Sequence, residues 1–239
     1  MHACESHPLW TKPEGSTRLI VVRHGETQWN QEKRFQGHVD IPLNERGIEQ
    51  AYLLRARLER IAHSANVPVG QLYAVCVSSD LNRAHHTAKV LHGPNPTPLI
   101  TTPELRERHY GHLSGLTSDE MQAQFPHAFH GLKNRIPEAE LTGGESLLGF
   151  YHRITSQVRR LIEQHRNQTI LLVAHGGVLD CMYRLAQGEP LHTLRSWLLP
   201  NCALNVIDHH PEGHFTVPLW ADVNHLLEDA GDEVDGRVT

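Results

Sequence analysis

The chain has 239 residues, which is long enough for a sizeable hydrophobic core and fits comfortably in one α/β domain. Hydrophobic residues make up 39% of it and charged residues 21%, which excludes a disordered or fibrous chain. The formal net charge of -5 excludes an overall basic field for nucleic acid or an anionic membrane, so any bound anion must be held by a local group of residues.

Short apolar runs alternate with helical patterns along the chain. In chain order we expect a strand over 19–22, a helix over 44–64, a strand over 72–77, a helix over about 80–91, a proline-rich connection over 94–103, a short helix over 117–125, a longer helix after Ser146, a strand over 169–174, a helix over 177–186, and two late strands over 203–208 and 214–220. Thr117 with Glu120 forms a capping-box pattern, and the late strands are read as a hairpin. The order predicts an α/β fold, a three-layer α-β-α sandwich with helices on both faces of a mainly parallel central sheet.

The expected domain organisation is a flexible N-terminal extension over 1–17, a single domain over 18–227 and an acidic C-terminal tail over 228–239. The four cysteines share no C-x-x-C spacing, which argues against a zinc knuckle or a disulfide framework and favours a reducing compartment. No apolar run reaches the roughly 18 residues that a membrane span needs, and 1–17 has no signal-peptide pattern. We therefore expect a cytoplasmic protein without a membrane partner.

Three predicted strand-to-helix junctions carry the same kind of chemistry. They are R-H-G over 23–25, S-S-D over 78–80 with Arg83 close behind, and H-G-G over 175–177. The carboxyl ends of parallel strands meet at one edge of a sheet, where ligands bind and helix N-termini favour anions. Two arginines, two histidines and glycine-flanked backbone therefore predict a small cationic pocket for a phosphate group.

A metal site is the alternative reading of so many histidines, of which the chain has 20. His24 and Glu26 match one half of a zinc deaminase signature, but the P-C-x-x-C half is absent. The adjacent pairs His85-His86 and His209-His210 are poor chelators because neighbouring side chains point in different directions. A single R-H-G or H-G would be weak evidence of a site, and only their equivalent positions make them strong. We expect no metal.

The motifs, taken together, resemble the histidine phosphatase superfamily, in the branch of cofactor-dependent phosphoglycerate mutases and small-molecule phosphatases. The similar segments follow the family's order, at R-H-G-E-T-x-W-N over 23–30, R-F-Q-G over 34–37, P-L-N over 42–44, S-S-D-L-N-R-A over 78–84, E-L-R-E-R-H-Y-G over 104–111, G-G-E-S over 143–146, A-H-G-G over 174–177 and N-C-A-L-N over 201–205. This series covers about 18–220 and implies a phosphoglycerate mutase-like fold.

The resemblance implies a phosphohistidine on His24, formed by in-line attack on phosphorus and then hydrolysed. Positive charge on Arg23 and Arg83 disfavours the imidazolium form of His24, which predicts a neutral nucleophile near pH 7. Arg23, Arg83, Asn30 and His175 are the expected donors to the phosphoryl oxygens, because phosphoryl transfer depends on positioning and electrostatics.

The resemblance places the general acid at Glu107, whose alternative reading is a solvated ion pair with Arg106 or Arg108. It also places Gln36 and Gly37 near the phosphate or the leaving group, Tyr110 at the entrance, and Gly176 among the binding residues. The pocket's cover is expected over about 117–144.

Two features separate a phosphatase from a mutase. The loop over 107–111 is closer to the mutase version, but the mutase lysine is missing from 115–118, and 130–141 offers only the separated Lys133 and Arg135 instead of an adjacent arginine pair. We therefore expect a metal-independent phosphatase, a phosphoric monoester hydrolase acting on small phosphosugar or phosphoglycerate-like monoesters.

The alternatives are a 2,3-bisphosphoglycerate-dependent phosphoglycerate mutase and, less favoured, a non-catalytic phosphate-binding module. No cofactor is expected, apart from 2,3-bisphosphoglycerate in the mutase case. The expected partner is a small-molecule phosphate ester, not nucleic acid, and the sequence leaves the oligomeric state open, a homodimer included.

Overall fold

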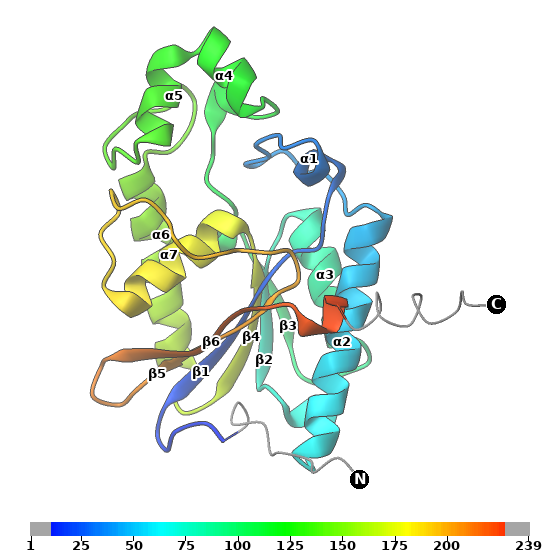
Figure 1. The fold of residues 1–239 in the computed structure, drawn as a ribbon. Helices are drawn as coiled ribbons and strands as arrows, with labels where there is room; N and C mark the ends of the chain where they lie inside the picture. Colours follow the sequence, from blue (N-terminus) through cyan, green and yellow to red (C-terminus); the bar gives the residue numbers. More distant parts are fainter. Residues whose placement is uncertain (1–10, 228–239) are drawn as a thin grey trace, which may run out of the picture.

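One six-stranded sheet organises the computed structural model, which describes residues 11–227 (Figure 1). The strand order is β3-β2-β4-β1-β5-β6. The strands are β1 (Thr17–Arg23), β2 (Val75–Ser79), β3 (Leu99–Thr102), β4 (Thr169–Ala174), β5 (Leu204–His209) and β6 (Phe215–Asp222). The first four strands are parallel, while β5 and β6 form an antiparallel hairpin beside β1. The predicted mainly parallel sheet and the late hairpin are therefore confirmed.

Helices cover both faces of this sheet. They are α1 (Gln28–Gln31), α2 (Glu45–Ser64), α3 (Asn82–His92), α4 (Ser118–Gln124), α5 (Pro126–Lys133), α6 (Leu147–Gln164) and α7 (Gly176–Gln187), with short 3-10 turns at Val69–Gln71, Pro103–Leu105 and Gly111–Leu113. Helices α2 and α3 lie on one face, α6 and α7 lie on the other, and α4 and α5 stand beyond the end of the sheet to which β1 runs (Figure 1). The predicted three-layer α-β-α sandwich is confirmed.

The central strand β1 shows how the sequence builds two cores. Its side chains alternate between the faces of the sheet. Leu19 and Val21 pack in the cluster that includes α6 and α7, whereas Ile20 and Val22 pack with α2 and α3. All four are fully buried, and each contributes about 1.5–3 kcal/mol of hydrophobic stabilisation. This double burial holds the end of β1, where the R-H-G motif follows, in a fixed position.

Side-chain caps begin the predicted helices where the sequence places them. The Asn44 side chain accepts the backbone N–H of Gly47 at the start of α2, and Ser146 accepts that of Gly149 at the start of α6. Thr117 and Glu120 form the predicted capping box of α4. Each such cap is worth about 1 kcal/mol.

Strand β3 and helix α5 differ from the prediction, and the four-residue helix α1 was not predicted either. Strand β3 lies inside the stretch over 94–103 that was predicted to be a connection. It is a four-residue run between Pro98 and Pro103 that pairs with β2. The flanking prolines are tolerated because β3 is the edge strand of the sheet. Helix α5 was not predicted at all. Its Pro126 occupies the first helical turn, a position that suits proline and does not end a helix.

The two ends of the domain were also predicted from sequence. Strand β1 begins at Thr17, and Lys12 Nζ donates hydrogen bonds of 2.7 Å to Ser16 O and Asn167 Oδ1. Residues 1–10 of the expected extension and the expected tail over 228–239 lie outside the described residues. Within 11–227, none of the helices combines the length and the apolar character that crossing a membrane requires.

Candidate active site

The three predicted junctions meet at the centre of the sheet, because β2, β4 and β1 are neighbours in it. Arg23 pairs with Ala174, so the residues that follow them, His24 and His175, lie side by side. Their ring centroids are 5.1 Å apart with an interplanar angle of 62°. The predicted convergence of the two histidine motifs is therefore a direct result of strand register.

Hydrogen bonds fix the ring and the backbone of His24. Its Nδ1 lies 2.7 Å from Gly25 O and must carry the proton, because a carbonyl oxygen only accepts. Nε2 therefore keeps its lone pair and is the nitrogen available for attack. The Asn201 side chain donates to His24 O at 2.7 Å, and Thr87 Oγ1 accepts from Gly25 N at 3.0 Å. The N-C-A-L-N motif included Asn201 without assigning it this positioning role, and Thr87 lies three residues after the S-S-D-L-N-R-A motif.

Both histidines are held in the neutral form. Burial lowers the pKa of His24 well below its ordinary value, and the charges of Arg83 and Arg23 lower it further. The pKa of His175 is lowered in the same way, first by burial and then by Arg83. The direction agrees with the sequence argument, but burial is a larger cause than the arginine charges that the sequence suggested.

Several buried nitrogen atoms of this site have no hydrogen-bond partner among the described residues. They are Arg23 Nε, Arg83 Nε and both ring nitrogens of His175. Three other guanidinium nitrogens bind backbone carbonyls: Arg83 Nη1 and Nη2 donate to Val39 O and Gly37 O at 2.8 and 2.7 Å, and Arg23 Nη1 donates to Leu199 O at 2.6 Å. Buried polar groups are rarely left unpaired in proteins. The two guanidinium N–H groups and the single N–H of neutral His175 are three donors around one nucleophile, and they suit the oxygens of a bound phosphoryl group.

A cavity of about 190 Å³ opens at His24. Its lining consists of Arg23, His24, Asn30, Lys33, Arg34, Phe35, Gln36, Arg83, Glu107 and Tyr110. It therefore brings together seven of the ten predicted site residues. A capping box with Thr27 fixes Asn30, and Gln36 Oε1 is buried without a partner in the described chain. Burial lowers the pKa of Arg83 to about 10, which leaves it charged at neutral pH. We call this space the phosphate pocket.

The remaining three predicted residues do not line the phosphate pocket. His175 lies beside the ring of His24 with both of its own ring nitrogens unpartnered in the described chain, and Gly37 acts through its carbonyl, which accepts from Arg83. Gly176 borders a neighbouring cavity together with Arg23. Conversely, Lys33, Arg34 and Phe35 line the pocket without having been assigned a role, although the R-F-Q-G segment already included two of them.

Glu107 is oriented by two backbone donors. Arg108 N donates to Oε1 at 2.8 Å, and Gly177 N, in the first turn of α7, donates to Oε2 at 2.9 Å. The alternative ion pair with Arg106 or Arg108 does not form, because Arg106 pairs with Asp80 at 2.6 Å and Arg108 Nε donates to Glu145 O. A Cβ on Gly177 would lie 2.2 Å from Glu107 Oε1. The second glycine of H-G-G is therefore required by the carboxyl group.

A second cavity of about 700 Å³ lies between α4, α5 and the body of the domain. It shares Arg23, Phe35 and Tyr110 with the phosphate pocket, so the two spaces are adjacent. Lys133 and Arg135, which the sequence shows as separated cations, both line it. We call this space the outer cavity.

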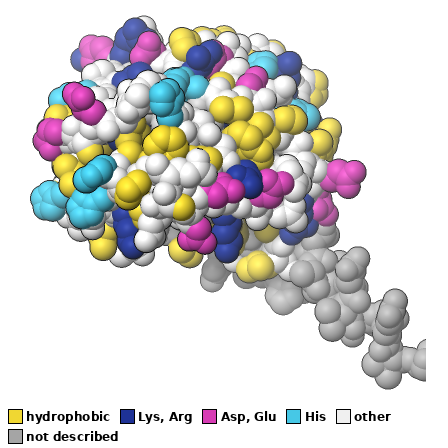
Figure 2. Space-filling view, turned by 90° about the horizontal axis from the view of Figure 1, so that it is seen from above, with side chains coloured by type: hydrophobic (Ala, Val, Ile, Leu, Met, Phe, Trp, Pro, Cys, Tyr) yellow, Lys and Arg dark blue, Asp and Glu magenta, His cyan; other side chains and the backbone are white. Residues whose placement is uncertain are grey.

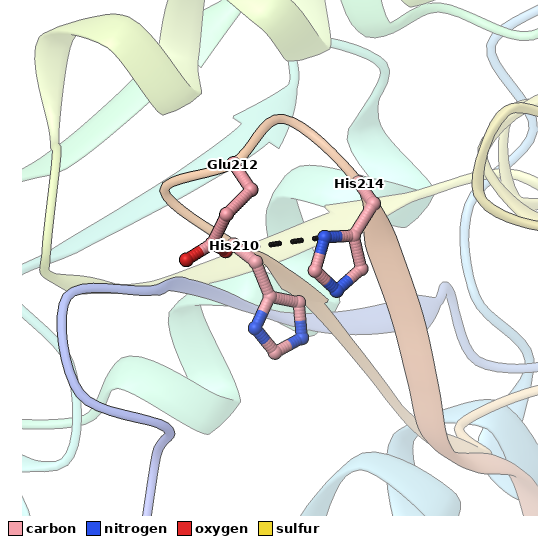
Figure 3. Close-up of side chains that lie close together, drawn as sticks. All are labelled: His210, Glu212 and His214. Carbon is pink, nitrogen blue, oxygen red and sulfur yellow. Dashed lines mark ion pairs between the residues drawn. The ribbon is translucent and has the colours of Figure 1, made fainter.

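Figure 3 shows a potential metal-binding group at the turn between β5 and β6. His210, Glu212 and His214 each offer a ligand atom, all within 4.8 Å of one another, and no other such group of three occurs in residues 11–227. The neighbouring His209 pairs with Thr17, at the start of β1, whereas His24 follows its end. The group therefore lies at the opposite end of the sheet from the phosphate pocket and contributes nothing to it.

Comparison with known proteins agrees with this geometry. The chain matches the histidine phosphatase superfamily (branch 1) over residues 19–223. It is 34% identical over 212 residues to phosphoglycerate mutase-like protein 4 of Arabidopsis thaliana, covering 88% of this chain and 87% of that protein. It is 32% identical over 213 residues to a metal-independent phosphoserine phosphatase of the same plant, covering 88% and 83%.

A solved structure, that of Bacillus stearothermophilus YhfR, superposes with a TM-score of 0.78 at 31% identity, covering 88% of this chain and 99% of that one. The relatives agree with the phosphoric monoester hydrolase expected from the motifs. From the match over most of its length and from its converging histidines and arginines, the chain belongs to the histidine phosphatase superfamily.

Proposed function

We propose that the protein is a metal-independent phosphatase that hydrolyses small phosphate monoesters through a phosphohistidine on His24. The observation that carries the proposal is a neutral His24 with Nε2 free, surrounded by buried donors of Arg23, Arg83 and His175 that have no partner in the described chain. A dianionic phosphoryl group supplies the missing acceptors. Phosphosugars and phosphoglycerate-like compounds are the expected substrates.

Each residue takes a role that its contacts support. Arg23, Arg83 and His175 bind the three nonbridging oxygens, and Asn30 and Gln36 complete the wall of the pocket. His24 Nε2 forms the N–P bond as the ester O–P bond breaks in line with it. Glu107 in its protonated form gives its proton to the leaving oxygen. Water then attacks phosphorus and loses a proton to the Glu107 carboxylate, which releases inorganic phosphate and returns His24 to its starting form.

Hydrolysis is favoured over transfer by the space next to His24. A mutase must keep water from its phosphohistidine, whereas here the phosphate pocket lies next to an outer cavity of about 700 Å³ and shares three lining residues with it. A three-carbon glycerate group fills only a small part of that space, and water remains beside the phosphohistidine. The mutase alternative has one observation in its favour, the cations Lys133 and Arg135 on the cavity wall.

The fate of 3-phosphoglycerate separates the two activities. Purified protein is incubated with it, with and without 2,3-bisphosphoglycerate, and scored for inorganic phosphate and for 2-phosphoglycerate, with p-nitrophenyl phosphate in parallel. Free phosphate without isomer, unaffected by EDTA, is the expected result. Fast isomerisation stimulated by the bisphosphate would establish the mutase, and no turnover or acid-labile labelling with any substrate would establish a binding module.

A cytoplasmic location is part of the proposal. The three cysteines in the described chain, Cys76, Cys181 and Cys202, are free and buried, which suits a reducing compartment.

A further inference from the structure

We infer that the natural substrate carries a second anionic group, a carboxylate or phosphate, on a leaving group with an apolar body, and that Arg108, Lys133 and Arg195 in the outer cavity bind this anion. The inference rests on the proposed function, because it concerns the part of the ester that leaves. It assigns a ligand chemistry to the outer cavity, which the His24 mechanism does not use.

The three cations differ from most arginines of this protein in having no carboxylate partner. Ion pairs occur at Arg18–Asp208, Arg34–Glu120, Arg46–Glu49, Arg55–Glu59, Arg57–Asp222, Arg106–Asp80, Arg153–Glu145 and Arg166–Glu163. Within residues 11–227, by contrast, Arg108, Lys133 and Arg195 make no ion pair with a carboxylate. They come from three segments far apart in the sequence, and the outer cavity is where they meet.

Arg108 is the most informative of the three because it is buried. Its exposed fraction is 6%, and burial lowers its pKa. Its Nε donates to Glu145 O at 3.0 Å, and its guanidinium carbon lies 5.9 Å from the centre of the Tyr110 ring. A charge taken out of water without a counter-ion is costly. An anionic ligand in the cavity offsets that cost.

The acidic residues on the cavity wall do not cancel this positive charge. Asp180 is already shared by Arg135 and Arg184, whose nitrogens lie 2.8 and 3.0 Å from its Oδ2. Asp119 is the other carboxylate of the lining. Arg195 also faces the catalytic side, since its charge lowers the pKa of Arg23. The cavity is therefore cationic although the chain as a whole carries a formal charge of -5.

Apolar side chains form much of the remaining wall, which favours an apolar body for the leaving group. Phe35, Phe129, Leu132, Phe150 and Leu194 line the cavity together with Tyr110. Figure 2 views the molecule from the end at which α4 and α5 stand, and shows hydrophobic side chains gathered across the middle of this face with lysines and arginines beside them. A space of about 700 Å³ has the size of pockets for drug-sized ligands.

A pair of substrates that differ only in remote charge tests the inference. We choose 4-carboxyphenyl phosphate and 4-carbamoylphenyl phosphate, which have nearly the same shape. The expected result is a kcat/KM ratio of about tenfold or more in favour of the carboxylate, since charge-assisted hydrogen bonds are roughly twice as strong as the neutral ones that the amide can accept. The ratio is expected to fall at high salt, because Lys133 and Arg195 are exposed.

Variants assign the preference to particular side chains. Arg195→Gln and Lys133→Gln are each expected to lower the ratio severalfold, through the carboxylate substrate far more than through the amide. The matched controls are Arg159→Gln on α6 and Lys89→Gln on α3, both exposed and outside either cavity, which are expected to keep the ratio.

The outcomes distinguish this inference from the proposed function. A ratio near one with both esters hydrolysed, or hydrolysis of p-nitrophenyl phosphate but of neither member of the pair, overturns the inference and leaves the phosphatase intact. A high ratio that the Lys133 and Arg195 variants do not change overturns the assignment of the residues. Absence of both turnover and phosphohistidine labelling overturns the proposed function itself.

Discussion

The phosphate pocket and the outer cavity are both lined by cationic side chains, but these cations differ in their burial and in the groups that hold them. In the phosphate pocket, Arg83 is 1% exposed and two of its nitrogens are fixed by backbone carbonyls. In the outer cavity, Lys133 and Arg195 are exposed, and neither makes an ion pair with a carboxylate within the described chain. Buried arginines held at strand ends suit the chemistry of one phosphoryl group, whereas exposed cations outside the sheet suit the proposed recognition of the leaving group, because surface segments tolerate sequence change.

The largest effect is expected from removing the nucleophile. His24→Ala should abolish the acid-labile phosphoenzyme and lower kcat by about 10³-fold or more for every ester, because no other group can form the covalent intermediate. Single-turnover experiments with radioactively labelled substrate measure both the amount of phosphoenzyme and the loss of turnover. His152→Ala on the exposed face of α6 is the control. Labelling that persists in His24→Ala would move the nucleophile elsewhere and remove the distinction between the two regions.

The next effect depends on the leaving group. Glu107→Gln keeps the shape of the side chain but cannot donate a proton, so kcat for an alkyl phosphate should fall by about 10²-fold. Turnover of p-nitrophenyl phosphate should fall much less, because nitrophenolate leaves without protonation. Glu104→Gln, an exposed neighbour in the same loop, is the matched control. Equal losses on both esters would contradict the assignment of the general acid.

A smaller change of the same kind is expected from Gly177→Ala. The new Cβ would lie 2.2 Å from Glu107 Oε1 and 3.0 Å from Phe150 Cε1, which displaces the carboxyl group without removing it. We expect roughly a tenfold loss for the alkyl phosphate and less for p-nitrophenyl phosphate. In Gly149→Ala the Cβ would meet only Ser146 Oγ, at 3.2 Å, and no atom of Glu107, which provides a glycine control. If both glycine variants lose turnover of the alkyl phosphate and of p-nitrophenyl phosphate equally, the losses come from impaired folding and not from the position of Glu107.

The two regions also differ in how far sequence reasoning reaches them. His24, Arg83 and His175 could be predicted to converge, because parallel strands bring their ends together and each end carried a motif. The contacts of Glu107 could not, since they depend on the close approach of the loop to Gly177 N. Arg195 belongs to none of the sequence motifs, and only the fold brings it into the same cavity as Arg108. The fold itself was largely predictable, but β3 was hidden by its flanking prolines and α5 by the proline that begins it.

The smallest expected effect is on stability, and it probes the buried region alone. Burial lowers the pKa of His24 and His175 below the value of about 6.5 that each has in the unfolded chain, so the unfolded state binds protons that the native state does not. The contribution of these neutral histidines to the free energy of unfolding is therefore fully present above about pH 6.5. It is lost as pH falls toward the native pKa values, by up to about 2 kcal/mol per histidine between pH 6.5 and 5.

Urea titrations at several pH values measure the free energy of unfolding. The double variant His24→Gln/His175→Gln should flatten this pH dependence relative to wild type, while His152→Gln on the surface should keep it. An unchanged slope in the double variant would mean that the two histidines are not the groups excluded from protonation in the native state, and that the phosphate pocket is as accessible to water as the outer cavity.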